Sequence, residues 1–449
     1  MQTDDYIQRT CTLVPSLNCL IFNKDGEDLY RKTYGVSDIE SDIKATMDTS
    51  YGIGSITKTF TALSFFKLIE NTPNILDSNI CEYFNNTKLF NPLKNSNIKI
   101  KHLLSHTTGI CSLSLSESRY NPKHYLIGKD INKNNIYDIL QNININKVDI
   151  PGNKFRYLNI GYILLGIIIE TISKIKYELY TEENIFQALD MNSTYFSNSC
   201  FPSKTTATPY VMASKETNTI GTLLKSEFQQ AGGIVSSLID LKKLIISLLN
   251  KDAKNKIIKD ITFNKMCISQ NILKYNTSRY KTYSGLGFFI NKNFFGDDLI
   301  FHNGGIMGGR ANISLIPKKG IGAIVLSNSD NISAEEVSKV LLSSLVYKKN
   351  FQNKIEFCEI TNNILGRYTS YNNNTNSIIR KKGNKLELIF DYKPEPKKYL
   401  LYLKTYSKTS IVMTAINEND YFTNNTFKYH LKNSSFEINQ YLFFKIKNI

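Results

Sequence analysis

The pattern Ser-x-x-Lys, in which a lysine follows a serine by three residues, is the first place in this chain where residue types and spacing could do chemistry. Three residues apart on a helix, the two side chains share a face, and a neutral lysine amine can take the proton of the serine hydroxyl. The serine oxygen then becomes a nucleophile. The pattern occurs six times, at Ser41, Ser55, Ser64, Ser96, Ser173 and Ser278.

The surrounding residues favour Ser55 over the other five serines. Ser55 follows Tyr-Gly-Ile-Gly, a turn that can expose it, and opens a helix that we predict over residues 55–70. Backbone N–H groups and the positive end of the dipole at a helix N-terminus suit an oxyanion hole. Ser64 lies further along the same helix, where we expect it to be packed. Ser55 and Lys58 are therefore the candidate nucleophile and base.

Two other short segments can bring polar groups to the same cleft. In Tyr157-Leu158-Asn159, alternate residues of an extended loop point to one side, so the tyrosine oxygen and the asparagine amide can face together. The segment His302-Asn303-Gly304-Gly305 holds the one His-x-Gly of the chain, and its glycines permit close approach of the backbone to a ligand.

Other catalytic patterns are missing from the sequence. It contains no Gly-x-Ser-x-Gly, no His-Glu-x-x-His, no metal-ligand spacing and no glycine-rich phosphate loop. Seven scattered cysteines include no Cys-x-x-Cys pair, so we expect reduced thiols. The sequence thus predicts no metal and no cofactor.

The elements that must position these residues are of mixed type. Strands at both ends of the first 350 residues, with helices between them, predict an α+β layered domain. The expected elements are a hairpin at residues 14–22 and 29–34, helices at 55–70 and 161–173, and paired strands at 311–316 and 321–327.

The last hundred residues differ in composition. They contain 2 of the 23 glycines and 15 Lys+Arg against 8 Asp+Glu. Short β-rich runs bounded by turn residues predict a small antiparallel sandwich or barrel. These runs are residues 377–379, 385–390, 399–405, 410–416, 426–431 and 441–446.

Length and charge limit the function classes. The chain has 449 residues, 41% of them hydrophobic, and a formal net charge of +16. Its lysines are dispersed, whereas nucleic-acid binding needs clustered charge, so we expect no nucleic-acid partner. Apolar runs are too short to cross a bilayer, and the first residues lack the apolar stretch of a secretory signal. We therefore expect a cytoplasmic protein without a membrane partner.

Taken in order, the motifs resemble the penicillin-recognising serine hydrolases, which include class C β-lactamases, D-alanyl-D-alanine carboxypeptidases, D-aminopeptidases and related esterases. The similar stretches are GIGSITKTFTAL, IKIKHLLSHTTGI, PGNKFRYLNIGYILLG, AGGIVSSLIDL, YSGLGF and HNGGIMGGRANISLIPKKGIGAIVLSNSD. They cover roughly residues 14–345. The resemblance implies a β-lactamase-like antiparallel sheet with flanking helices and an all-helical lobe, over residues 1–349. Residues 350–449 look similar to the lipocalin-like barrel of some family peptidases.

The resemblance also implies roles for particular residues. Ser55 would be acylated, with Lys58 as its base, and the backbone N–H groups of Ser55 and Gly305 would form the oxyanion hole. Tyr157 would shuttle the proton from Ser55 to the leaving group and later activate the deacylating water, a role that requires a phenol whose pKa is lowered by the cation of Lys58. Asn159 would donate to the amide carbonyl of the substrate.

His302 marks a departure from the family pattern, because many members have the lysine of Lys-Thr-Gly there. Lysine offers a fixed charge to a substrate carboxylate, whereas histidine is largely neutral at pH 7. His302 and Gly304 would border the bound substrate. The same resemblance makes His102 and His106 packing and capping residues rather than a metal pair.

The sequence thus predicts a serine hydrolase that cleaves amide bonds of short peptides, including peptides with D-amino acids, through an acyl-enzyme. A homo-oligomer is expected from the family barrel. Two alternatives stay open: an esterase on small acyl esters or weak β-lactamase, and an inactive binding module whose basic tail recruits an acidic partner.

Overall fold

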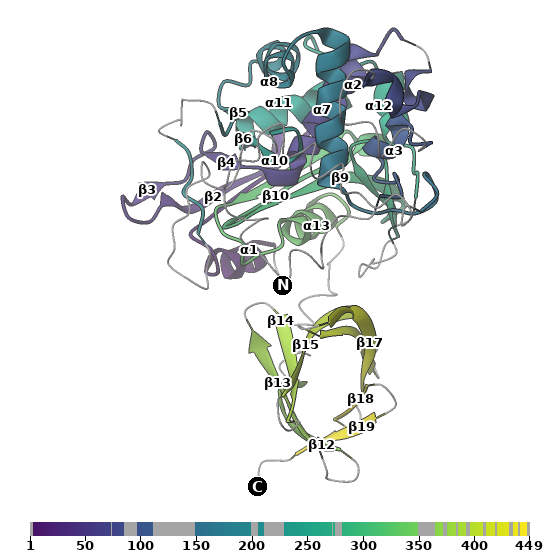
Figure 1. Cartoon of the computed structure of the whole chain (residues 1–449). Helices are drawn as coiled ribbons and strands as arrows, with labels where there is room; N and C mark the ends of the chain where they lie inside the picture. The colour runs from purple at the N-terminus through teal and green to yellow at the C-terminus, as the bar shows by residue number, and fades with distance from the viewer. Residues whose placement is uncertain are drawn as a thin grey trace. The chain divides into compact units, whose positions relative to one another are not determined.

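The structure is a computed structural model in which the described residues form two compact units, one ending at Lys348 and one beginning at Ile364 (Figure 1). Each unit is treated by itself below. The described residues are 3–72, 74–84, 97–110, 149–198, 205–210, 229–271, 273, 281–348, 364–370, 375–382, 385–391, 396–406, 410–417, 420–430, 434–438 and 441–446.

An eight-stranded antiparallel sheet forms the centre of the first unit, in the order β3-β2-β1-β11-β10-β9-β8-β7. Its strands are β1 (Ser16–Asn23), β2 (Asp28–Asp38), β3 (Ile43–Lys44), β7 (Thr282–Ser284), β8 (Phe289–Phe294), β9 (Asp297–Ile306), β10 (Gly309–Ile316) and β11 (Ile321–Ser327). The predicted β1–β2 and β10–β11 hairpins are confirmed. A small second sheet joins β4 (Ser50–Gly52), β5 (Tyr195–Phe196) and β6 (Ile234–Ser237).

Helices cover both faces of the main sheet. Figure 1 shows α1 and α13 on one face and α2, α7 and α11 on the other. The described helices are α1 (Thr3–Cys11), α2 (Thr57–Leu68), α3 (Ile100–Leu104), α7 (Asn159–Ser173), α8 (Tyr177–Thr181), α10 (Gln229–Gly232), α11 (Leu238–Leu249), α12 (Asp260–Met266) and α13 (Ala334–Leu345). Short helical turns are η1 (Gly54–Ile56), η2 (Ile75–Asp77), η3 (Ile80–Tyr83), η6 (Glu182–Phe186), η7 (Gln187–Leu189) and η9 (Pro317–Lys319). The layered α+β fold is confirmed, and no described helix has the length and apolar character of a membrane span.

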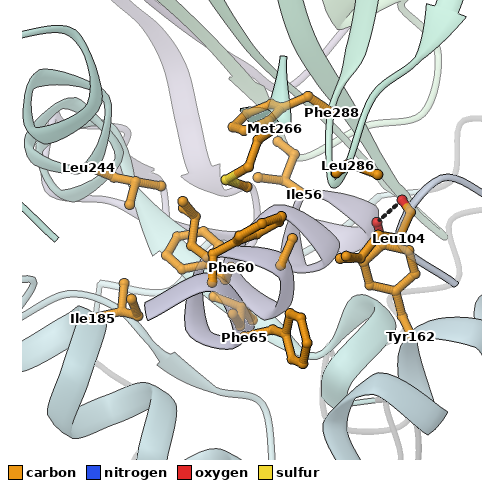
Figure 2. Close-up of a cluster of buried hydrophobic side chains, with 14 of the residues drawn as sticks. Ile56, Phe60, Phe65, Leu104, Tyr162, Ile185, Leu244, Met266, Leu286 and Phe288 are labelled. Atoms are coloured by element: carbon orange, nitrogen blue, oxygen red, sulfur yellow. Dashed lines mark hydrogen bonds between the residues drawn. The ribbon is translucent and has the colours of Figure 1, made fainter. Parts of the chain in front are cut away.

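Helix α2 is the centre of the helical layer because it is buried on nearly every side. Figure 2 shows Phe60 and Phe65 of α2 among apolar side chains from other elements, including Ile185, Leu244 and Met266. Hydroxyl groups on α2 find partners within the core: Thr59 donates to the Gly287 carbonyl at 2.9 Å and Thr61 to the Gln230 carbonyl at 2.6 Å. Buried polar groups are tolerated only when bonded in this way. The start of α2, which carries Lys58, is therefore held firmly.

The second unit is a closed antiparallel barrel. Its strands are β12 (Gly366–Ser370), β13 (Asn376–Lys382), β14 (Lys385–Phe390), β15 (Lys397–Tyr406), β16 (Ser410–Asn417), β17 (Asp420–His430), β18 (Ser435–Ile438) and β19 (Tyr441–Lys445). Pairing of Tyr368 with Lys445 closes the ring. The buried cluster inside it is rich in aromatic residues such as Phe427, Phe436 and Phe443. The predicted small β-barrel is confirmed, with β12 and β18 in addition to the predicted strands.

Candidate active site

Ser55 lies in the turn η1, between β4 and α2. Gly54 has φ +49°, and a Cβ at this position would lie 2.7 Å from the Gly305 carbonyl oxygen. A Cβ on Gly304 would lie only 1.9 Å from the carbonyl oxygen of Ile53. Glycine is therefore required on both sides of this contact. The result is that β9 presses against the turn and brings the Gly305 backbone beside Ser55.

Three of the predicted residues meet at one oxygen atom. Lys58 Nζ lies 3.1 Å from Ser55 Oγ, and the Tyr157 hydroxyl donates to the same Oγ at 2.7 Å. The i, i+3 spacing of Ser55 and Lys58 produces the first contact, at the start of α2. Tyr157 comes from a segment 102 residues further along the chain.

Lys58 is fully buried, and its contacts within the described ranges are with uncharged groups. Its ammonium donates to the carbonyl of Ala231 on α10 at 2.6 Å and lies 5.0 Å from the centre of the Tyr157 ring and 5.9 Å from that of Tyr162. Burial lowers the pKa of Lys58 to about 7, because removal from water disfavours the charged amine. The neutral amine is thus available near physiological pH.

The electrostatics of Tyr157 differ from the prediction. The sequence-based expectation was a pKa lowered by Lys58. Although the Tyr157 side chain is 36% exposed, its hydroxyl is enclosed against Ser55, and this loss of water raises the pKa of Tyr157; the hydrogen bond to Ser55 offsets the rise only in part. The physical reason is that the same burial that disfavours the phenolate also removes the charge from Lys58. Tyr157 is therefore a proton donor at neutral pH.

His302 lies on β9 and is 2% exposed. Its Nδ1 is 2.8 Å from the carbonyl oxygen of Asn303, which can only accept a hydrogen bond, so Nδ1 carries the proton and Nε2 the lone pair. Burial, with a contribution from Lys58, lowers the pKa of His302 to about 3. The imidazole is neutral throughout the physiological range.

Asn159 is half-buried at the first residue of α7, so this helix begins two residues before the predicted start. Leu158 is extended, with φ −141° and ψ 109°. Asn159 is two residues from Tyr157 but takes no part in the hydrogen bonds that join Ser55, Lys58 and Tyr157. Of the other Ser-x-x-Lys serines, Ser64 is buried in α2 against Thr181. Two serines, Ser96 and Ser278, lie outside the described residues.

Two contributors to the site were not predicted. One is the Ala231 carbonyl, which accepts from Lys58; its segment AGGIVSS was noted only as a stretch similar to the family. The other is His106, whose ring stacks on Tyr157 with centroids 4.4 Å apart. The capping role expected for the two histidines does hold for His102, whose Nδ1 accepts from the Lys99 N–H at 3.1 Å.

A serine hydroxyl in contact with both a buried lysine and a phenol is an arrangement that can activate the serine oxygen as a nucleophile. The sequence profile of the Beta-lactamase family matches residues 19–343, and the chain belongs to this family. In the described part of the chain, no group of His, Cys, Asp or Glu is arranged to hold a metal ion.

Curated relatives with similar sequences come from bacteria and from a social amoeba. The chain is 28% identical to Protein flp of Staphylococcus aureus (strain MW2) over 342 residues, which are 75% of this chain and 64% of that protein. It is 26% identical to Beta-lactamase-like protein 4 of Dictyostelium discoideum over 347 residues, covering 72% of this chain and 58% of that protein. The matches thus span under two thirds of these relatives.

Solved structures show similar folds. An octameric penicillin-binding protein homologue from Pyrococcus abyssi has a TM-score of 0.76 and 26% identity, with 98% of each chain covered. A penicillin-binding protein from Bacillus halodurans has a TM-score of 0.60 and 20% identity, covering 75% of this chain and 97% of that one. SurE, solved with D-Leu, has a TM-score of 0.60 and 16% identity, covering 98% and 97%.

Proposed function

We propose that the protein is a serine hydrolase that cleaves amide bonds of short peptides through an acyl-enzyme. The observation that carries the proposal is the contact of one hydroxyl oxygen, Ser55 Oγ, with both a buried amine and a phenol. The lowered pKa of Lys58 supports a neutral amine that can act as the base, and the raised pKa of Tyr157 means that its hydroxyl is protonated and has a proton to give.

In the proposed acylation, Ser55 Oγ gives its proton to Lys58 Nζ and forms a bond to the substrate carbonyl carbon. The carbonyl electron pair moves to oxygen, and the N–H groups of Ser55 and Gly305 bind the oxyanion. The C–N bond then breaks, and the leaving amine takes the Tyr157 hydroxyl proton. Lys58 returns its extra proton to the phenolate, and water hydrolyses the acyl ester to restore Ser55.

The substrate is proposed to lack a carboxylate at the His302 position. A neutral imidazole with its proton committed to the Asn303 carbonyl presents a lone pair, which accepts a hydrogen bond and repels an anion. The Asn159 amide would hold the substrate carbonyl, and Gly304 would let the substrate lie close to β9. Esters of small acids are the second candidate, because ester cleavage needs the same acylation steps but less help for the leaving group.

Residues 1–349 are proposed as the hydrolase domain and residues 350–449 as a lipocalin-like domain, supported by the closed antiparallel barrel. A homo-oligomer is also proposed. Its support is that the homologue from Pyrococcus abyssi, which matches over 98% of both chains, is octameric.

Labelling with a fluorophosphonate tests the nucleophile. Wild-type protein should gain the probe mass on one peptide containing Ser55, and Ser55→Ala should gain none. Ser64→Ala, on the helix α2 that follows Ser55, is the matched control and should label like wild type. Equal labelling of Ser55→Ala and wild type would refute the assignment, and no labelling of wild type would favour the inactive binding module.

Products identify the substrate class. A panel of short L- and D-peptides, each with a free or an amidated C-terminus, is compared with p-nitrophenyl esters, and cleavage is followed by mass spectrometry. We expect peptide cleavage with no preference for the free carboxylate. Turnover of esters alone would replace the peptidase by an esterase.

A further inference from the structure

His106 contacts three consecutive residues around the candidate acid. Its backbone carbonyl accepts from the Arg156 N–H at 2.7 Å, and its Nδ1 accepts from the Leu158 N–H at 3.1 Å. Between these two bonds, its ring stacks on the Tyr157 ring, with centroids 4.4 Å apart and planes inclined by 28°. One residue thus fixes the backbone on both sides of Tyr157 and the plane of its ring.

The conformation of His106 is costly, which points to a role beyond filling space. Its φ is +57°, a left-handed value that few residues other than glycine adopt. Because Nδ1 accepts a hydrogen bond, Nε2 carries the proton, and this buried Nε2 has no hydrogen-bond partner among the described residues. Strained backbone and unpaired buried donors both destabilise a fold and concentrate at functional sites.

The charge state of His106 suits the same role. Burial, with contributions from Lys58 and His302, holds the pKa of His106 well below its ordinary value. The ring that faces Tyr157 is therefore a neutral aromatic surface. Such a surface does not stabilise a phenolate, so Tyr157 keeps its proton until a leaving group takes it.

We propose that His106 is a positioning residue that holds the Tyr157 hydroxyl on Ser55 Oγ and thereby governs expulsion of leaving groups that need a proton. The inference rests on the proposed function, in which Tyr157 is the acid. It predicts that substitution of His106 lowers the rate by a factor that depends on the leaving group. A merely structural loss of packing around Tyr157 would lower the rate for all leaving groups alike.

Two substrates with the same acyl group test this prediction. One is an amide, whose leaving amine must be protonated, and the other is a p-nitrophenyl ester, whose leaving group departs without a proton. His106→Asn removes the ring while keeping a residue that tolerates positive φ. We expect kcat for the amide to fall about 10-fold or more, and kcat for the ester to stay within about 2-fold.

Four further variants sharpen the measurement. Tyr157→Phe should also lower kcat for the amide more than for the ester, and by a larger factor than His106→Asn. Adding His106→Asn to Tyr157→Phe should cause little further loss of kcat, because the effects of substitutions at contacting residues do not add. His106→Phe keeps a ring but loses the acceptor for the Leu158 N–H, so its amide activity should fall between those of wild type and His106→Asn. His102→Asn removes another buried histidine of the same segment, one that bonds the Lys99 N–H instead, and should leave the amide-to-ester ratio unchanged.

The outcomes separate the inference from the proposed function. Equal losses on both substrates in His106→Asn, or full additivity with Tyr157→Phe, would overturn the positioning role while the hydrolase remains. A Tyr157→Phe variant without any amide-to-ester split would overturn the acid role of Tyr157 and the inference with it. Wild type that cleaves neither substrate would overturn both proposals.

Discussion

The two faces of β9 hold buried lysines under opposite electrostatic conditions. On the face of His302 and Gly304 lies Lys58, whose contacts are a hydroxyl, a carbonyl and two aromatic rings. On the face of Phe301 and Asn303 lies Lys339 of α13, which is 5% exposed.

A carboxylate makes the difference between the two lysines. Lys339 Nζ bonds Glu335 one turn earlier on α13, and the same carboxylate accepts from Asn303 at 2.5 Å. Among the residues that the structure describes, Lys58 has no such carboxylate partner, and its pKa falls to about 7. The comparison teaches that burial alone does not make a lysine a base: it must also be kept from a counter-ion.

The largest expected effect comes from removing each lysine in turn. Lys58→Met should reduce acylation by ~10²–10⁴-fold, because it removes the proposed base. Lys339→Met is the matched control, since it removes a lysine of similar burial from the other face of β9, and should keep kcat/KM within about 3-fold. Acylation rates are read from probe labelling and from peptide turnover. Comparable losses of activity in both variants would show that removal of either buried lysine destabilises the fold, and would contradict the role of Lys58 as base.

The next effect is the pH dependence of acylation. Only neutral Lys58 can take the Ser55 proton, so kcat/KM should rise with pH through an apparent pKa near 7 and level off above it. The residual activity of Lys58→Met should not show this rise of kcat/KM with pH. A wild-type profile that is flat from pH 5.5 to 8.5 would contradict the assignment of Lys58 as base.

The lowered pKa of Lys58 also makes the stability of the fold depend on pH. Unfolded Lys58 holds its proton up to about pH 10.4, whereas folded Lys58 releases it near pH 7. Between these values the unfolded state binds more protons, so the Lys58 contribution to the unfolding free energy grows as pH rises. It is fully present above the unfolded pKa and is lost as pH falls to about 7. Lys58→Met should remove this slope.

The smallest effect on activity is expected from Glu335→Gln, which leaves Lys339 without its carboxylate. Because Glu335 is 29% exposed, water screens part of the lost interaction, and we expect the unfolding free energy to fall by about 1–2 kcal/mol. Turnover at 25 °C should stay within about 2-fold. Thermal unfolding and kcat measured on one preparation check both statements. A large loss of turnover would mean that the Asn303–Glu335 bond also holds His302 and Gly304 in place.

The sequence predicted those parts of the molecule that depend on local spacing. The Ser55–Lys58 contact follows from helix geometry, and the hairpins β1–β2 and β10–β11 follow from strand runs around turn residues. The strands β12 and β18 were missed because each is short, and closure of the barrel depends on pairing between Tyr368 and Lys445, far apart in sequence.

Features that depend on burial could not be predicted from the sequence. The pKa direction of Tyr157 was predicted wrongly because a cation seemed to lie beside it, whereas burial neutralises that cation as well. The tautomer of His302 depends on one backbone carbonyl. His106 gave no signal beyond helical spacing with His102, because its contact with Tyr157 exists only after residues more than 50 apart have packed.

The pairing of β1 with β11 has a consequence for how the protein is made. Leu17 lies opposite Ser327, and Ser16 bonds Asn328, 312 residues away. A ribosome must therefore deliver nearly the whole first unit before the middle of its sheet can close, and such high contact order slows folding. Until β11 is made, β1 is paired on one edge only, with β2, and a product that stops short of β11 leaves β1 and β10 without the strand that joins them.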